Sequence, residues 1–171
     1  MGRYRPPAPP KSLYITREGF LSLKDEEKAI WIRRREVTAA LSAAAAEGDR
    51  SENAEYIYRK KELREIDRRV RYLQKRLPVL KVVDQLPSDR QRVYFAAWVT
   101  LLPEEGEEVT YRIVGPDEID ADPAHISMDS PLAKALLGKH LDDEVEVVTP
   151  RGCIRYEIVG IRYKPDEHGN S

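Results

Sequence analysis

Two carboxylates three residues apart, Asp49 and Glu52, lie in a turn that the sequence predicts between two long helices. This spacing puts both side chains on one face of a helical turn, where their oxygens could bind a hard divalent cation such as Mg²⁺. Magnesium prefers octahedral coordination and keeps several waters, so a partner would have to complete the site. The same spacing also fits a capping box, with Asp49 as the N-cap and Glu52 at N3, which would only stabilise the helix.

An excess of positive charge follows this turn. From Arg59 to Arg76 there are nine basic residues and three acidic ones, a local net charge of +6. Charged helix surfaces usually mix both signs, so this excess favours sequence-independent contact with nucleic-acid phosphates, although a solvated helix face is the alternative. The asymmetry extends further, because residues 1–80 carry +7 and residues 81–171 carry −8. The two halves therefore either meet different partners or form ion pairs with each other.

Other chemically capable residues are scattered. No two of His125, His140 and His168 have the i, i+4 spacing of a helical metal pair, and Cys153 is the single cysteine. We interpret all four as structural or surface residues, and no cofactor-binding loop is present. A single cysteine excludes an intramolecular disulfide, and no apolar run approaches the ~18 residues that span a membrane. With prolines rather than an apolar stretch near its N-terminus, the chain is expected to be a soluble cytoplasmic protein.

The elements that position the two carboxylates are predicted helices. Apolar residues recur every seven positions within residues 17–46, at Leu23, Ile30, Val37 and Ala44. Thr16 is the predicted N-cap of this helix and Gly48 its predicted end. A second seam follows Ala54, at Ile66, Val70, Leu73, Leu77 and Leu80. Because few residues join the two segments, they must form an antiparallel hairpin about 45 Å long. Glu27 and Arg34 occupy seam positions, which predicts weaker packing midway.

Beyond Leu86 and Pro87 the pattern changes from helix to strand. Strands are predicted within residues 93–99, 109–114, 145–148 and 154–163, and Ser130–Gly138 has the cap, early proline and glycine stop of one short helix. Helices followed by strands predict an α+β protein of separate domains. We assign an extended proline-rich arm to residues 1–12, a coiled-coil domain to 13–82, a sheet domain to 83–165 and a polar tail to 166–171.

Several motifs resemble one known family. Gly48–Tyr56, which reads Gly-Asp-Arg-Ser-Glu-Asn-Ala-Glu-Tyr, resembles the tip motif of the Gre transcription elongation factors, and Lys61–Leu73 resembles the GreB branch. Tyr111–Gly115, Ile126–Ala133 and Thr149–Pro150 follow in the order of the family's C-terminal domain. The resemblance covers about residues 13–165. It implies an antiparallel α-helical coiled-coil hairpin followed by an FKBP-like antiparallel sheet domain with one short helix.

The resemblance also implies a mechanism. The sheet domain would dock on the rim of the RNA polymerase secondary channel, and the hairpin would enter that channel in a backtracked elongation complex. Asp49 and Glu52 match the family's tip residues, which help to hold a second Mg²⁺ for hydrolysis of the extruded RNA 3′ end. RNA polymerase supplies the other ligands, so the protein would be a stimulatory factor, a monomer, and not a freestanding nuclease.

Further sites follow from the resemblance by position. Asp129, Ser130 and Pro131 match the docking loop, although a helix N-cap followed by proline explains them equally. The candidates for contact with extruded RNA are Arg59, Lys60, Lys61, Arg64, Arg68 and Arg69.

The sequence also fits two rival functions, and it departs from the family pattern at one position. The chain could be a channel-binding inhibitor without cleavage stimulation, or an unrelated coiled-coil adaptor with a merely capping tip. The intact tip motif favours cleavage stimulation.

The departure from the family pattern lies in Arg33–Val37, where a proline present in most relatives is missing. Loss of one residue rotates one side of a helix by about 100° against the other, so the register of the hairpin is in question.

Overall fold

A computed structural model describes residues 5–47 and 53–163. Asp49 and Glu52, the predicted helix end at Gly48, and the predicted polar tail with His168 lie outside the described residues. The chain divides into two compact units. One is Glu18–Leu80, and the other combines the segment up to Arg17 with the chain from Lys81 onward. No helix in the described part of the chain is long and apolar enough to cross a membrane.

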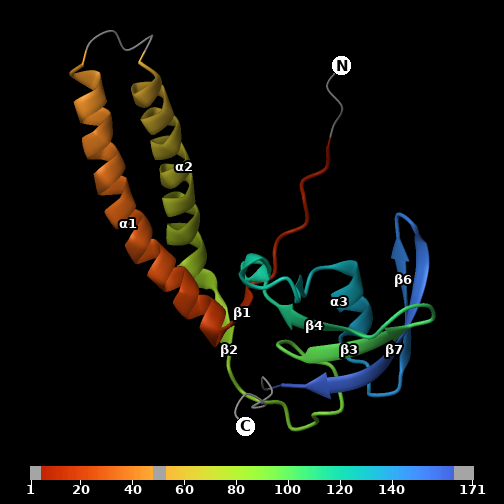
Figure 1. Ribbon diagram of the computed structural model, residues 1–171. Helices are drawn as coiled ribbons and strands as arrows, with labels where there is room; N and C mark the ends of the chain where they lie inside the picture. Colours follow the sequence, from red (N-terminus) through yellow and green to blue (C-terminus); the bar gives the residue numbers. More distant parts are fainter. Residues whose placement is uncertain (1–4, 48–52, 164–171) are drawn as a thin grey trace, which may run out of the picture. The chain divides into compact units, whose positions relative to one another are not determined.

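The first unit is a pair of long helices lying side by side (Figure 1). Helix α1 (Arg17–Ala45) and helix α2 (Ala54–Arg76) run antiparallel, and a 3₁₀ turn (Leu77–Val79) continues α2. At 1.5 Å per residue the two helices are about 43 and 35 Å long. The predicted range of the first helix is confirmed to within a residue at its C-terminal end.

The predicted apolar seams are the buried faces of this hairpin. Helix α2 buries Ile66, Val70 and Leu73, and α1 buries its own seam residues Leu23, Val37 and Ala44. Ile66 and Val70 form one cluster with Val37, and the half-buried Ile30 and Leu63 pack against it. Helix α1 is continuous through the segment that lacks the proline, and its seam residues on both sides stay buried. The seam of this chain is therefore continuous through Arg33–Val37.

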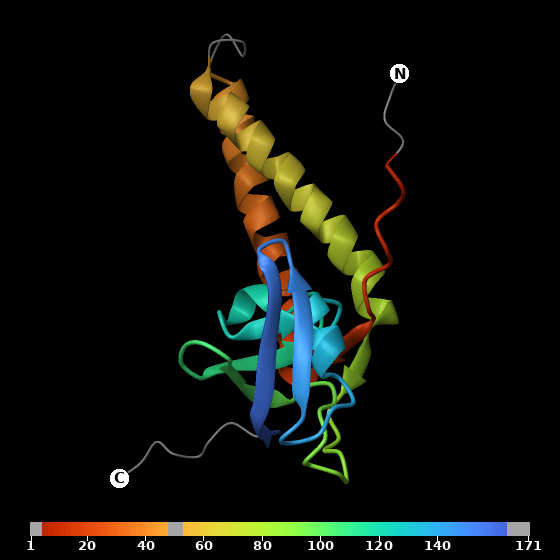
Figure 2. The same ribbon diagram turned by 90° about the vertical axis from the view of Figure 1, so that its right-hand side faces the viewer.

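The second unit is built on a five-stranded sheet with the strand order β5-β4-β3-β7-β6. Figure 2 shows β6 and β7, in blue, side by side. Most neighbours are antiparallel, as predicted, and β5 at one edge pairs with β4 in parallel. The strands are β3 (Trp98–Pro103), β4 (Val109–Val114), β5 (His125–Ser127), β6 (Glu144–Thr149) and β7 (Gly152–Arg162). A 3₁₀ turn (Ile119–Ala121) leads into β5.

One face of the sheet is covered by helix α3 (Pro131–Leu136). Val99 and Leu101 alternate with less buried neighbours along β3, the period-2 pattern of a strand with one buried face. They form the core with Ile113, Ile158 and the α3 residue Leu136, all fully buried. The predicted strand from residue 93 starts only at Trp98, because a turn precedes it in which Ala96 has a φ of +70°. The α+β class is otherwise confirmed.

A small parallel sheet, which the sequence did not predict, lies in the same unit. Strand β1 (Tyr14–Thr16) pairs with β2 (Lys81–Val83), so the segments that lead into and out of the hairpin are hydrogen bonded to each other. Each strand has three residues, too few to show an alternating pattern. Thr16, the predicted helix N-cap, is the last residue of β1 and directly precedes α1.

Glu118 anchors β1 to the sheet unit. Its carboxylate, in a residue only 5% exposed, accepts hydrogen bonds from the Thr16 amide at 3.0 Å, the Thr16 hydroxyl, and the Gly115 amide at 2.8 Å. A Cβ atom at Gly115 would overlap the carbonyl oxygen of Tyr14, so glycine is required for this approach. A buried carboxylate with several donors stabilises its partners more than a neutral acceptor does.

Replacing Glu118 with glutamine should loosen β1. Glutamine keeps the size of the side chain, but its NH₂ group would face the donors of Thr16 and Gly115. Leaving a buried donor without an acceptor costs about 1–3 kcal/mol. Hydrogen exchange at Thr16 and Gly115 should accelerate roughly tenfold or more, measured on the full chain by mass spectrometry or NMR. Asp120→Asn, at an exposed residue of the neighbouring 3₁₀ turn, is the matched control. Unchanged protection in Glu118→Gln would contradict the anchoring role.

Candidate functional site

The N-terminal end of α2 borders the segment that carries the predicted metal ligands. Its N-cap is Asn53, whose side-chain oxygen accepts a hydrogen bond from the Tyr56 amide at 3.1 Å. The capping-box interpretation required Asp49 as N-cap and Glu52 at N3, and it is wrong because the helix starts at Ala54. Asp49 and Glu52 themselves lie outside the described residues. The sequence signal for the true cap was present, since asparagine is among the preferred N-cap residues.

Asn53 also contacts the other helix. Its side-chain nitrogen donates to the carbonyl oxygen of Ala44 at 2.8 Å, in the last turn of α1. One side chain thus accepts from an amide at the start of α2 and donates to a carbonyl at the end of α1, groups that helix termini leave without intrahelical partners. The segment with the two predicted metal ligands lies between Glu47 and Asn53 in sequence. Within residues 5–47 and 53–163, no three acidic, histidine or cysteine side chains gather as a metal site.

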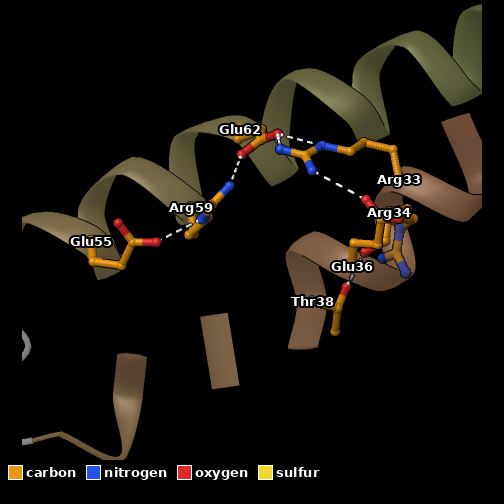
Figure 3. A network of polar contacts seen from close by, with 7 residues as sticks. All are labelled: Arg33, Arg34, Glu36, Thr38, Glu55, Arg59 and Glu62. Carbon is orange, nitrogen blue, oxygen red and sulfur yellow. Dashed lines mark hydrogen bonds and ion pairs between the residues drawn. The ribbon is translucent and has the colours of Figure 1, made fainter. Parts of the chain in front are cut away.

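A chain of ion pairs joins the two helices (Figure 3). Glu62 on α2 accepts from Arg33 on α1, at 2.6 and 2.9 Å, and from Arg59 on its own helix at 2.9 Å. Arg59 also donates to Glu55 at 2.8 Å, and Arg33 to Glu36 at 3.2 Å. We call these five residues the interhelix network. Its central carboxylate, Glu62, has a side chain only 19% exposed.

The charges in this network reinforce one another. Burial by itself would raise the pKa of Glu62, but hydrogen bonds from Arg33 and Arg59 outweigh it and hold the pKa below its ordinary value. The pKa values of Arg33 and Arg59 are raised, chiefly by their hydrogen bonds to Glu62 and Glu55 respectively. All three groups therefore remain charged at neutral pH, and the network holds α1 and α2 together electrostatically.

Two further ion pairs cross the seam of the hairpin. Arg34 donates to Asp67 at 2.7 Å, and Arg69 donates to both oxygens of Glu26 at 2.7 and 2.8 Å. Arg34 was predicted to weaken the seam, and it meets a carboxylate there instead of an apolar partner. Of the six residues predicted to contact RNA, Arg59 and Arg69 are thus engaged in ion pairs of the hairpin itself.

The other four predicted RNA contacts lie on an exposed face of α2. Lys60, Lys61, Arg64 and Arg68 are exposed, and no described carboxylate forms an ion pair with any of them. Lys60 lies over the ring of Tyr56, 5.9 Å from its centroid. The exposed residues Arg71 and Lys75 extend this row. From Lys60 through Arg64, Arg68 and Arg71 to Lys75, successive residues are four, four, three and four positions apart, a spacing that keeps them on one helix face. We call this row the basic face: Lys60, Lys61, Arg64, Arg68, Arg71 and Lys75.

The predicted docking loop lies at the start of α3. Ser130 is the N-cap, accepting from the Ala133 amide at 3.2 Å, and Pro131 occupies the first turn with its side chain exposed. The structural explanation of these two residues is therefore confirmed. The carboxylate of Asp129 accepts from the Ser12 amide at 2.9 Å and from the Ser12 hydroxyl. This loop thus holds the segment that precedes β1, a role that the sequence did not reveal.

The remaining chemically capable residues take no part in these clusters. The Nδ1 atom of His125 lies 2.9 Å from the Glu118 carbonyl oxygen, and His140 is exposed beside Asp143. Cys153 is exposed, and the pKa of its thiol is raised mainly by a hydrogen bond to Glu146, so the unreactive thiol form is favoured.

Comparison with known families gives a consistent result along the chain. The family described as "Transcription elongation factor, N-terminal" matches residues 13–82. The family described as "Transcription elongation factor, GreA/GreB, C-term" matches residues 87–163. The two matches meet near the change from helices to strands.

Individual relatives are similar over nearly their whole length. A protein of Pseudomonas aeruginosa named transcription elongation factor GreB is 58% identical over 166 residues, covering 96% of this chain and 99% of the relative. One of Yersinia pestis with the same name is 57% identical over 156 residues, covering 91% of each. Among solved structures, GreA factor homolog 1 of Thermus thermophilus is 24% identical with a TM-score of 0.41, covering 89% of this chain and 99% of that one.

Replacing Glu62 with glutamine tests the interhelix network. Removing the central charge should lower the free energy of unfolding of the hairpin by about 1 kcal/mol at neutral pH. The pKa of Glu62 is lowered on folding, so its contribution is present above the ordinary value of 4.5 and is lost as the pH falls through the folded value. Wild type and variant should therefore converge in acid. Urea unfolding followed by helical circular dichroism measures both effects.

Glu36→Gln is the matched control for this experiment. Glu36 contacts the same Arg33, but from the same helix and with a side chain 60% exposed. It should change the stability by only a few tenths of a kcal/mol. Equal effects of the two substitutions, or a difference that persists at a pH well below the folded pKa of Glu62, would show that the link between the helices is not what stabilises them.

Proposed function

Because the chain belongs to the GreA/GreB family of transcription elongation factors, we propose that it rescues backtracked RNA polymerase by stimulating Mg²⁺-dependent cleavage of the RNA 3′ end. In this proposal the hairpin enters the secondary channel of RNA polymerase and presents Asp49 and Glu52 at the active centre. The observation that carries it is at the tip. Asn53, and not Asp49, is the N-cap of α2 directly after the two carboxylates in sequence, and both family models match the chain on either side of the change from helices to strands.

Asp49 and Glu52 suit a hard divalent cation that a second protein helps to hold. Carboxylate oxygens are the ligands that Mg²⁺ prefers, and two of them leave positions for waters and for ligands from the partner. When bound, Mg²⁺ would lower the pKa of a coordinated water and neutralise charge at the scissile phosphate. The contribution of this chain is to deliver and orient the two carboxylates. We therefore propose a stimulatory factor of the polymerase's own reaction rather than a freestanding nuclease.

The basic face suits the extruded RNA. From Lys60 to Lys75 it extends about 22 Å along α2, at 1.5 Å per residue. Its exposed ammonium and guanidinium groups are not paired with described carboxylates, so they can contact phosphates without first breaking an ion pair. Arg59 and Arg69 would have to give up such pairs. Within the predicted set, we therefore propose Lys60, Lys61, Arg64 and Arg68 as the principal RNA contacts.

Docking on the channel rim is assigned to the loop before α3. Pro131 is exposed there, while Asp129 and Ser130 are half-buried and hydrogen bonded within the unit. A rigid loop of this kind offers a defined shape to a partner at low entropic cost. An inhibitor that only occludes the channel, or an adaptor, would have no use for the intact acidic tip motif, and neither is favoured.

Neutralising the tip should abolish stimulation without abolishing binding. Asp49→Asn and Glu52→Gln keep the side-chain size but remove the charge that holds the cation, so the rate of stimulated cleavage should fall by roughly 100-fold or more. The measurement is shortening of end-labelled RNA in backtracked elongation complexes with Mg²⁺. Glu65→Gln, an exposed carboxylate on α2, is the control and should cleave normally. Normal cleavage by both tip variants would refute the metal role.

Substitutions on the basic face should weaken RNA binding and leave the stability of the hairpin unchanged. Arg64→Gln with Arg68→Gln should weaken crosslinking to extruded RNA and make it less sensitive to salt, because the log–log slope falls by about 0.7 for each phosphate that the protein no longer neutralises. The helical unfolding curve should not move. Arg69→Gln should instead lower hairpin stability, because it removes the pair with Glu26. If Arg69→Gln weakened crosslinking more than the double variant did, the assignment of these residues would be reversed.

A further inference from the structure

We propose that Asn53 is a positioning residue for the tip, acting through the bond that it makes between the two helix ends. This inference rests on the proposed cleavage function. Asn53 itself is not placed at the metal: its side chain is committed to Tyr56 on its own helix and to Ala44 on the other. Its role would be to fix the two ends from which the segment carrying Asp49 and Glu52 departs.

The bonds define the orientation of the Asn53 amide. A backbone N–H can only donate, and a carbonyl oxygen can only accept. The side-chain oxygen must therefore face the Tyr56 amide, at 3.1 Å, and the side-chain nitrogen must face the Ala44 carbonyl, at 2.8 Å. The backbone carbonyl of Asn53 accepts the first helical bond, from the Ile57 amide at 3.1 Å. A single residue thus begins α2 and links it to the end of α1.

Asparagine is the N-cap residue that suits both bonds. Serine and aspartate cap helices about as well. The hydroxyl of serine is too short to span both partners, and the carboxylate of aspartate would set a negative charge against the Ala44 oxygen. Ala44 is also suited to the contact, because its small side chain lies in the buried seam and lets the opposite chain approach. The preference for an amide here is explained by the cross-helix bond and not by capping.

In this proposal, the bond preorganises the two helix ends that flank the tip. The Ala44 carbonyl also accepts from the Glu47 amide at 3.3 Å, so the same atom joins the closing turn of α1 to the side chain that opens α2. With both ends tied, the carboxylates would reach the active centre from a fixed span. Misplacement of a reacting group by about 1 Å can cost on the order of 100-fold in rate. Loss of the tie should therefore impair the chemical step more than the binding of the factor.

A series of variants separates the tie from the cap. Asn53→Ser and Asn53→Asp keep the N-cap but lose the donor to Ala44, whereas Asn53→Ala loses both bonds. With backtracked elongation complexes and Mg²⁺, the first two should lower the maximal cleavage rate at saturating factor by about tenfold. They should also raise the Mg²⁺ concentration needed for half-maximal rate. The factor concentration at half-maximal rate and the thermal unfolding midpoint should stay near wild type, while Asn53→Ala should also melt earlier.

Three outcomes would overturn the inference. Full cleavage rates for Asn53→Ser and Asn53→Asp would show that the tie is not needed. A weaker affinity at an unchanged maximal rate would assign Asn53 to polymerase binding, and an earlier melting of both variants would make its role structural. Asp49→Asn and Glu52→Gln, assayed alongside, separate the two proposals. If they are inactive while Asn53→Ser is fully active, only the positioning role fails, and if they are active the cleavage proposal itself fails.

Discussion

A hairpin of two helices has one seam in which to bury apolar side chains, and this constraint shapes the whole N-terminal unit. Within the described residues, this seam buries three side chains of each helix, at Leu23, Val37 and Ala44 on α1 and at Ile66, Val70 and Leu73 on α2. Electrostatic contacts add to it, from Arg33 to Glu62, Arg34 to Asp67 and Arg69 to Glu26. Surface ion pairs are individually weak, but pairs that share partners, as at Glu62, lose less conformational entropy per bond. The hairpin is therefore held by an apolar seam with ion pairs along its borders.

The same constraint sorts the charges of α2 into two groups. Side chains beside the seam can reach α1, so Glu62, Asp67 and Arg69 are used within the hairpin. On the exposed face, Lys60, Arg64 and other lysines and arginines form no ion pair with a described carboxylate. The net charge of the α2 sequence therefore combines charges that are paired within the hairpin with charges that are not. Most of the acidic side chains of α2 form ion pairs within the hairpin, so the exposed face is more basic than the composition of the helix suggests.

Local periodicity predicted the helices and most of the strands, because the information lies within a few residues. Val37 and Ile66 could be assigned to a seam from their spacing alone, and Ser130 to a helix start from its own neighbours. The anchors of the sheet unit could not be found in this way. Glu118 accepts from Thr16 across 102 residues, and Asp129 accepts from Ser12 across 117. The sequence around each carboxylate contains no pattern that identifies so distant a partner. Strands β1 and β2 depend on those anchors and on each other.

The choice of cap at the tip shows how local chemistry and function fit together. An aspartate N-cap would have stabilised α2 as well as asparagine does, but its charge would be partly neutralised by the amides and the dipole of the helix. A carboxylate used in this way is a poorer ligand for a cation. Asn53 satisfies the helix with a neutral group and makes a second bond that a carboxylate could not make. In the proposed function, the negative charges of Asp49 and Glu52 are balanced instead by the metal that they hold jointly with a partner.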